Sequence, residues 1–432
     1  MKKDKNKNVT RRDFIKKMGF TATAIGISSA VPKLIKPAQA AAKDHILIGR
    51  PLPITGPVSF FSEPSPWLDN RAIDAINKDG GIYIEEYGKK LPVKVKIVDT
   101  ESNPTKAAEL GSMLIQKDKI DIMYVSNTPA TVAPVSGNCE RFKIPSVATN
   151  CPPEMWLPGG PFHWSFNASV SSQDFAASFI QAWDNVKTNK VVGLLAQNDA
   201  DGIAWVEAAQ GPLTEAGYNI IDLGRFPVGT MDYTTFINGW KKENVEILFA
   251  NMAAPDFIRA WKQCHHQGFI PKICTCGRAL IAPSAVIAIG GDLGLGTSTE
   301  GIWQSDFPFK SSLTGETPKD LCDAYEAKFN KQWTPFLGGL HYGWEIVADV
   351  LKRAKTLNKE TLRNAFAATN FDTIGGHVKF NEENVAVMAS GAIQWVKGKK
   401  WPFECILVAN GNYKELTISG KLISIRELRG IS

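Results

Sequence analysis

Residues 91–148 decide the fold, and they read LPVKVKIVDT ESNPTKAAEL GSMLIQKDKI DIMYVSNTPA TVAPVSGNCE RFKIPSVA. Apolar residues alternate with lysines at the start, which is typical of a strand. A proline then opens a helical pattern, and short apolar runs alternate with helical patterns after it. The predicted elements are, in order, strand 91–97, helix 104–117, strand 120–125, helix 130–142 and strand 144–148. Strands and helices that alternate in this way predict a parallel sheet covered by helices on both faces.

The same alternation continues on both sides of this stretch. An apolar strand over 45–49 and a helix over 69–78 precede it. A break rich in proline and glycine at 152–161 separates it from a second series, which starts with a helix capped by Ser171 or Ser172 and ending at 186. The rest of that series is strand 191–195, helix 203–216, strand 219–223, helix 233–243, strand 245–250, helix 255–267 and strand 271–275.

The last part of the chain departs from this alternation. It is predicted as helices 318–331, 339–354 and 359–368, then strands 377–380, 392–396 and 404–408. The fold class is therefore α/β, with two Rossmann-like series in tandem. Ligands of such sheets bind at the carboxyl ends of the strands. The loops in that position follow Gly49, Val125, Ala148, Ala196, Ala250 and Thr275.

Residues 1–40 have the layout of an export signal. Thr10-Arg11-Arg12-Asp13-Phe14-Ile15-Lys16 resembles the twin-arginine translocation motif, and an apolar run over 18–31 leads to a small-residue cleavage site. The run is too short and too rich in Gly, Ser and Thr to span a bilayer. We therefore expect cleavage after Ala40, or after Ala42, and export to the periplasm by the twin-arginine translocase.

Removal of this segment changes the charge balance. Residues 1–40 hold ten Lys and Arg and two Asp and Glu, while the whole chain carries +6, so the remainder carries −2 by difference. The remainder has no cluster of basic residues, which argues against a nucleic-acid partner. Its length of about 390 residues exceeds what one hydrophobic core usually supports and predicts two lobes.

The sequence offers no constellation for catalysis or for a bound metal. It has no P-loop and no GxSxG elbow, so we predict neither enzymatic activity nor a cofactor. Cys264, His265 and His266 together with Cys274 and Cys276 match no usual zinc spacing. Seven cysteines leave at least one unpaired, and Cys264 with Cys274 is a geometrically possible disulfide.

Ile48-Gly49-Arg50-Pro51-Leu52-Pro53-Ile54-Thr55-Gly56-Pro57 resembles the opening of periplasmic binding proteins of the branched-chain amino acid transporter family. Further segments that match this family are 75–82, 99–104, 144–147, 190–194, 232–236 and 251–268. The resemblance implies the type I periplasmic binding protein fold, with two Rossmann-like lobes whose parallel sheets are flanked by helices. A three-crossover hinge closes the lobes on a small-molecule ligand, and the closed protein docks on an inner-membrane ABC permease. Carried onto this chain, lobe 1 is 44–166 with 306–375, and lobe 2 is 167–305 with 376–432.

The resemblance also implies which residues of lobe 1 hold the ligand. Phe61 matches an aromatic contact in the first loop. The loop after the third strand gives a hydroxyl and a backbone amide to a ligand carboxylate, and its nearest matches are Asn127 and Thr128. Groups after the fourth strand assist them, and these match Thr149, Asn150 and Cys151. Loops of this kind direct amides at an anion.

Lobe 2 departs from the family pattern. Two tyrosines that line the family's cleft match Asp201 and Ala253, and the acid that holds a ligand ammonium is absent, with Arg278 adjacent. The family's disulfide positions match Ser102 and about Thr128, so that bridge is missing. The resemblance therefore implies a wider pocket for a bulkier ligand, aromatic or polar-decorated, with Asp201 and Arg278 as polar contacts. The alternative is that each of these two charges is exposed or locally paired.

Three functions remain open at this point. The first is capture of an amino-acid-like or aromatic carboxylate compound for import, and the second is a ligand sensor on the same fold. The third is an exported enzyme, because twin-arginine substrates often carry redox cofactors. The missing nucleophile and cofactor motifs argue against the third function.

Overall fold

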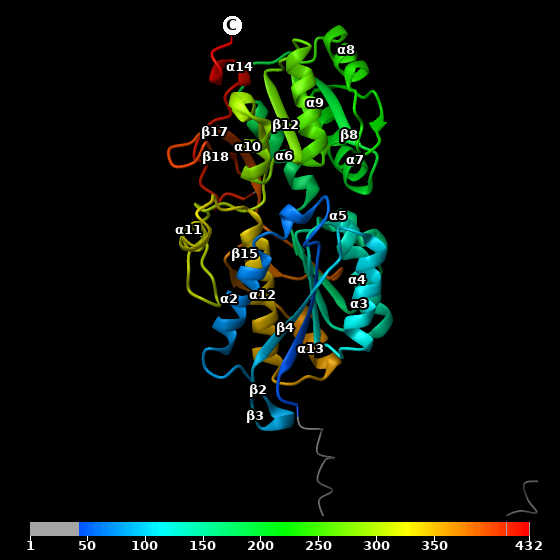
Figure 1. Cartoon of the computed structure of the whole chain (residues 1–432), viewed down its shortest axis with the longest axis vertical. Helices are drawn as coiled ribbons and strands as arrows, with labels where there is room; N and C mark the ends of the chain where they lie inside the picture. Colours follow the sequence, from blue (N-terminus) through cyan, green and yellow to red (C-terminus); the bar gives the residue numbers. More distant parts are fainter. Residues whose placement is uncertain (1–42, 412, 432) are drawn as a thin grey trace, which may run out of the picture. The chain divides into compact units, whose positions relative to one another are not determined.

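The computed structural model describes residues 43–411 and 413–431, so the expected signal peptide over 1–40 lies outside the described residues. Two β-sheets with helices on their faces make up most of the described chain (Figure 1). This arrangement confirms the predicted α/β class with two tandem series. None of the helices in the described ranges has the length and apolar character needed to cross a membrane.

The first sheet has six parallel strands in the order β16-β7-β6-β5-β1-β4. They are β1 (Ile46–Leu52), β4 (Val93–Asp99), β5 (Ile122–Ser126), β6 (Ser146–Thr149), β7 (Ser165–Ser169) and β16 (Val385–Val387). Its helices are α2 (Ser65–Asn77), α3 (Pro104–Gln116), α4 (Pro129–Phe142), α5 (Pro153–Trp156), α11 (Pro318–Phe329), α12 (Phe336–Ala354) and α13 (Lys359–Ala367). Two hairpins accompany it, β2 (Ile82–Ile84) with β3 (Lys89–Leu91) and β14 (Asn370–Thr373) with β15 (Gly376–Lys379).

The second sheet has eight strands, with the path β10-β8-β11-β12-β13-β17-β18 and β9 paired to β8. They are β8 (Val191–Gln197), β9 (Asn219–Ile221), β10 (Arg225–Phe226), β11 (Ile247–Met252), β12 (Ile273–Arg278), β13 (Ser298–Gly301), β17 (Gly391–Lys397) and β18 (Phe403–Ala409). The pairs that involve β17 are antiparallel, and the other pairs are parallel. Its helices are α6 (Ser172–Trp183), α7 (Ala200–Glu215), α8 (Thr234–Lys242), α9 (Ala254–His266), α10 (Pro283–Ile289) and α14 (Ile425–Leu428).

Within the described ranges the chain passes between the sheets three times, after β7, after β13 and after β16. The passage after β16 differs from the expected boundary at 375/376. Residues 376–379 form β15, and β16 pairs in parallel with β7, so Val385 lies opposite Asn167 in the first sheet. Three residues of β16 are too few to show a period of two, which is why the sequence did not reveal this strand.

Local sequence explains where the helices that matter most begin. Asn103 and Ser171 accept hydrogen bonds from backbone amides at the starts of α3 and α6, so Ser171 is the cap of the two serines considered. Asp199 does the same for α7 by accepting from Gly202 N at 2.8 Å. The predicted start of that helix at 203 is therefore three residues late, and Asp201 lies in its first turn.

The long helix α12 lies at the centre of the part of the structure that contains the first sheet. It contacts α2, although more than 250 residues of chain separate their starts, and Figure 1 shows the two side by side. Fifteen of its residues are buried, which is typical of a helix enclosed on all sides. The opposite face of the first sheet has its own core, formed by α3 and α4 against side chains such as Met123 and Val125.

All seven cysteines are free thiols, so the disulfide considered between Cys264 and Cys274 is absent. Both residues are fully buried, and burial raises the pKa of the Cys264 thiol to about 12. Thiols in such surroundings are poor nucleophiles. We assign them to core packing.

Candidate functional site

A pocket lies where loops that follow the carboxyl ends of strands in the two sheets come together. It contains about 550 Å³ of space that no atom fills, part of it open to solvent. Lining residues from the first series include Phe61, Thr128, Asn150, Pro152, Ser169 and Phe336. Lining residues from the second series include Asp201, Trp205, Asn251, Arg278, Ile281 and Glu300. Each series therefore supplies one wall, at the edge where α/β sheets bind ligands.

The pocket brings together five of the nine residues predicted to hold the ligand. These are Phe61, Thr128, Asn150, Asp201 and Arg278. The other four do not line it, and they are Asn127, Thr149, Cys151 and Ala253.

Asn127 supports the wall from behind. Its side-chain Nδ2 donates to Ser62 Oγ at 2.9 Å, and its side-chain Oδ1 accepts from Asn150 Nδ2 at 2.9 Å. Asn127, Thr128 and Asn150 all have positive φ angles, of 71°, 72° and 53°. Such backbone conformations persist only where surrounding contacts hold them, and they concentrate at binding sites.

Thr149 and Cys151 are not among the lining residues either. The Thr149 hydroxyl lies 3.2 Å from Tyr124 Oη, and the Cys151 amide donates to Ser169 Oγ at 3.0 Å. Both predicted residues therefore bond within the protein. Ser169, which the sequence did not suggest, lines the pocket in their place.

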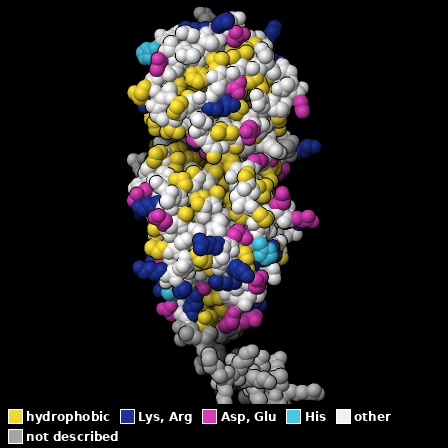
Figure 2. Space-filling model, turned by 90° about the vertical axis from the view of Figure 1, so that its right-hand side faces the viewer, with side chains coloured by type: hydrophobic (Ala, Val, Ile, Leu, Met, Phe, Trp, Pro, Cys, Tyr) yellow, Lys and Arg dark blue, Asp and Glu magenta, His cyan; other side chains and the backbone are white. Residues whose placement is uncertain are grey.

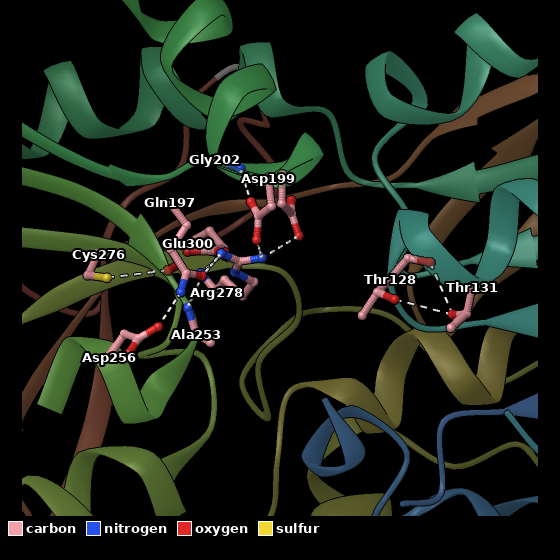
Figure 3. A network of polar contacts seen from close by, with 12 residues as sticks. Thr128, Thr131, Gln197, Asp199, Gly202, Ala253, Asp256, Cys276, Arg278 and Glu300 are labelled. Atoms are coloured by element: carbon pink, nitrogen blue, oxygen red, sulfur yellow. Dashed lines mark hydrogen bonds and ion pairs between the residues drawn. The ribbon is translucent and has the colours of Figure 1, made fainter. Parts of the chain in front are cut away.

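Backbone amides of the first wall were expected to bind a ligand anion, but several already have partners. The backbone N–H of Asn127 donates to Thr149 O at 3.2 Å, and the backbone N–H of Thr128 donates to Asn150 O at 3.3 Å. Pro129 and Pro152 have no N–H. This wall therefore presents side-chain groups, among them the Thr128 hydroxyl, which lies 3.2 Å from Thr131 Oγ1 (Figure 3).

A glycine on α12 gives Asn150 its place in the wall. A Cβ atom at Gly339 would lie 1.9 Å from Asn150 Oδ1, far inside contact distance. Gly343, one turn further along α12, likewise leaves room for Tyr124, whose hydroxyl oxygen would lie 2.2 Å from an added Cβ. The first turns of α12 are thus shaped around residues at the ends of β5 and β6.

Gly339→Ala should therefore displace the Asn150 side chain and perturb the pocket. We expect the free energy of unfolding to fall by about 1–3 kcal/mol, the usual range for overpacking a core. Gly137→Ala is the matched control, because Gly137 is an exposed helical glycine whose Cβ would meet nothing within 4 Å. Alanine there should stabilise α4 by up to about 1 kcal/mol. Urea denaturation of both variants measures the difference, and equal stabilities would contradict the proposed clash.

Aromatic rings form the apolar part of both walls. Phe61 and Phe336 have ring centroids 4.4 Å apart, and Phe175 and Trp205 have centroids 5.9 Å apart. All four line the pocket. On the face drawn in Figure 2, hydrophobic side chains also gather across the middle of the molecule. Such surroundings favour a ligand with a flat or bulky apolar body.

Arg278 is the centre of the charged wall (Figure 3). It ends β12, three residues beyond the predicted strand, and its Nη1 lies 2.9 Å from Asp199 Oδ2 and 3.4 Å from Asp201 Oδ2. Only 9% of its side chain is exposed. Burial raises the pKa of Asp201, and the positive charge of Arg278 opposes that effect. The two predicted polar contacts are therefore partners of each other as well as lining residues.

Gln197 holds Arg278 from behind and was not predicted. Its Oε1 accepts from Arg278 Nη2 and from Ala253 N, and its Nε2 donates to Asp256. Ala253, predicted to line the cleft, instead occupies the N-cap position of α9, and its backbone N–H is bonded to Gln197. The signal was a polar residue directly after the apolar run of β8, where the carboxyl end of a strand was expected.

Glu300 supplies a second acid that the sequence analysis missed. It lies on β13, is 4% exposed, and its Oε1 accepts from Arg278 N at 2.9 Å. Burial raises the pKa of Glu300 to about 7, against the effect of hydrogen bonds from Thr299 and from the backbone. As expected from the sequence, the family's acid is absent beside Arg278 on β12, but the neighbouring strand β13 provides one.

The raised pKa of Glu300 predicts a pH dependence of stability. Because the folded pKa of about 7 exceeds the ordinary glutamate value of 4.5, the folded protein binds this proton more tightly than the unfolded chain does. The stability associated with the proton is therefore complete below about pH 4.5 and is lost as the pH rises through 7. Glu300→Gln should change the free energy of unfolding little at pH 4.5 and raise it at pH 8, by on the order of 3 kcal/mol. Urea denaturation at both pH values tests this, and an equal effect at both would refute it.

Among the described residues no group of three or more His, Cys, Asp and Glu side chains is placed to hold a metal ion. The pocket instead combines neutral polar groups and aromatic rings with a cluster of one cation and several carboxylates. Such a set can recognise a small organic molecule with polar groups at its ends.

Known proteins share this architecture. The leucine-, isoleucine-, valine-, threonine-, and alanine-binding protein of Pseudomonas aeruginosa is 21% identical over 344 residues, which are 79% of this chain and 87% of that protein. A leucine-binding protein from Thermotoga maritima superposes with a TM-score of 0.72 at 18% identity, over 84% of this chain and 99% of that one. A solute-binding protein of an ABC transporter from Rhodopseudomonas palustris, solved with 3,4-dihydroxybenzoic acid, gives 0.66 at 17% identity, over 86% and 100%.

These likenesses confirm the type I periplasmic binding protein fold that the resemblance implied. The model of the family described as periplasmic binding protein matches residues 45–400, well over half of the sequence. The chain therefore belongs to the periplasmic binding protein family.

Proposed function

We propose that this protein captures a small ligand outside the cytoplasm and delivers it to an ABC permease in the inner membrane. The observation that carries the proposal is the pocket, whose two walls come from the carboxyl ends of two separate sheets. A ligand that contacts both walls stabilises the closed arrangement, and three chain passages guide the closure. In this proposal residues 1–40 direct export through the twin-arginine translocase and are removed in the periplasm.

We divide the described chain into two lobes on the basis of strand pairing. Lobe 1 contains the first sheet, over 44–169 and 302–387, and lobe 2 contains the second, over 170–301 and 388–431. Ligand binding should then reduce the radius of gyration. Small-angle scattering with and without saturating ligand tests the closure, and an unchanged radius with proven binding would contradict it.

The ligand that fits best has an aromatic or bulky apolar body with charged or polar ends. Phe61 and Trp205 lie on different walls and can cover the two faces of such a body. The carboxyl groups of Asp199, Asp201 and Glu300 outnumber the single guanidinium of Arg278, which favours an amino group at one end of the ligand. The Thr128 hydroxyl and the Asn150 amide suit a carboxylate at the other end.

Two of these relatives are associated with ligands of different classes. The Pseudomonas protein is named for aliphatic amino acids and threonine, and the Rhodopseudomonas protein was solved with an aromatic acid. Leucine would not fill the pocket, and it would leave polar groups of the charged wall without partners. An unpaired buried charge costs several kcal/mol, so closure on leucine should be unfavourable.

Calorimetry decides between these ligands. L-Leucine, L-phenylalanine, L-tyrosine, benzoate and 4-hydroxybenzoate are titrated into the mature protein, after a thermal-shift screen that exploits stabilisation by bound ligand. At least one aromatic compound is expected to bind more tightly than L-leucine. Tight binding of L-leucine with no response to the aromatic compounds would overturn the proposed ligand class.

A further inference from the structure

Four polar atoms of the pocket lining are buried without a hydrogen-bond partner. They are Ser172 Oγ, Trp205 Nε1, Asn251 Oδ1 and Arg278 Nε, among nineteen such side-chain atoms in the described chain. Each buried polar atom without a partner costs about 1–3 kcal/mol, so proteins leave few of them. A concentration of four in one pocket indicates that something else supplies the partners.

Trp205 and Asn251 form the most defined part of this set. They are 4% and 2% exposed, and they come from α7 and from the end of β11. Both approach Gly277 of β12, where an added Cβ atom would lie 2.6 Å from Trp205 Cη2 and 3.0 Å from Asn251 Nδ2. The missing side chain of Gly277 therefore lets the indole and the amide meet beside Arg278.

The Trp205 ring is held in place by other aromatic residues. It stacks on Phe249 with centroids 5.4 Å apart, and Phe179 lies at 5.6 Å. The indole N–H is therefore fixed before a ligand arrives, which lowers the cost of binding. Asn251 Oδ1 has no donor among the described residues, so a partner for this atom has to bring a proton.

We propose that the pocket recognises a hydroxyl group on the ligand, which donates to Asn251 Oδ1 and accepts from Trp205 Nε1. This inference rests on the proposed function and specifies its ligand as a hydroxylated aromatic compound. An ammonium group could bond to Asn251 only, because it has no lone pair for the indole N–H. A carboxylate could bond to Trp205 only, because it has no proton for Asn251. A hydroxyl offers both from one atom.

Matched ligand pairs test the proposal on the wild-type protein. L-Tyrosine is compared with L-phenylalanine, and 4-hydroxybenzoate with benzoate and 4-methoxybenzoate, by calorimetry. We expect the hydroxylated member of at least one series to bind at least about tenfold more tightly. The methoxy compound should lose this advantage, because it keeps the oxygen acceptor and lacks the proton.

Variants locate the effect. Asn251→Leu, which preserves approximate size, should remove the preference for the hydroxyl, so that the two members of each pair bind with similar affinities. Asn219→Leu is the control, because Asn219 is exposed on β9 of the same sheet and does not line the pocket. Should Asn251→Leu fail to fold, Trp205→Phe with the same pairs takes its place.

The outcomes separate this inference from the proposed function. Equal affinities within both series, with clear binding of the aromatic parents, would overturn the hydroxyl proposal and leave ligand capture intact. Binding of none of the compounds would overturn the aromatic ligand class and the hydroxyl proposal together. A preference that survives in Asn251→Leu and in Trp205→Phe would also refute the assignment.

Discussion

Replacing Arg50 by methionine is expected to lower the free energy of unfolding by about 3–5 kcal/mol. Arg50 and Asp69 are both fully buried, and Arg50 Nε lies 3.2 Å from Asp69 Oδ2. The variant would leave the Asp69 carboxylate in the core without its cation. Burial already raises the pKa of Asp69, and the charge of Arg50 is the main opposing effect.

The same arginine supports the pocket. Its Nη1 donates to Ser126 Oγ at 2.9 Å, and its guanidinium lies 3.7 Å from the centre of the Tyr124 ring. Ser126 ends β5, directly before Asn127 and Thr128. Loss of Arg50 should therefore loosen the strand end from which the first wall starts, so ligand affinity should fall together with stability.

A double variant separates the lost pair from the lost packing. Arg50→Met with Asp69→Leu removes both charges, and replacement of a whole buried ion pair by apolar groups is often neutral. We expect it to recover most of the stability lost in Arg50→Met, although Trp344 Nε1 loses its bond to Asp69 Oδ1 at 2.7 Å. Chemical denaturation measures all three proteins. A loss below about 1 kcal/mol in Arg50→Met would show that the pair matters little.

Sequence patterns were sufficient for elements with a clear period and a local cap. The alternation before Asp99 and the proline at the start of α3 are local signals, and the structure has a strand and a helix there. They were insufficient where partners are distant. The pairing of β16 with β7 joins residues more than 200 positions apart, and no local feature of Val385–Val387 indicates it.

The same distinction applies to the pocket. The carboxyl ends of parallel strands share one edge, which indicated the loops after Val125 and Ala148. The family resemblance then selected Thr128 and Asn150 within them, and both line the pocket. Glu300 was missed because β13 is only four residues long and largely polar, so it shows no strand pattern. The match of Ala253 to a cleft tyrosine did not anticipate that Gln197 would hold its amide away from the pocket.

Arg278→Met should be the most damaging change in the pocket itself. Asp199, Asp201 and Gln197 all bond to the Arg278 guanidinium, and the variant leaves the two carboxylates without a cation. We expect the free energy of unfolding to fall by about 2–3 kcal/mol at pH 7, less than for Arg50 because the carboxylates retain some contact with solvent. Ligand affinity should fall as well, because Arg278 holds Asp201 and Gln197 in place in the charged wall.

The loss should also depend on pH. Burial raises the pKa of Asp201, and Arg278 is the main group that opposes this, so the variant carboxyl should take up a proton more readily. The protonated acid carries no unpaired charge, and the destabilisation should therefore shrink as the pH falls toward 5. Arg225→Met is the control, since Arg225 pairs with Asp222 at 2.8 Å and both side chains are partly exposed, at 22% and 29%.

Denaturation of both variants at pH 5 and pH 7, with calorimetry of ligand binding, measures these effects. Arg225→Met should cost less than about 1 kcal/mol, as pairs in contact with solvent usually do, and should bind ligand as the wild type does. Equal losses of unfolding free energy in the two variants would mean that Arg278 contributes no more than a residue of an ordinary surface ion pair. Wild-type ligand affinity in Arg278→Met would show that Arg278 does not belong to the site. The loss of a guanidinium that is enclosed with the ligand would change the affinity.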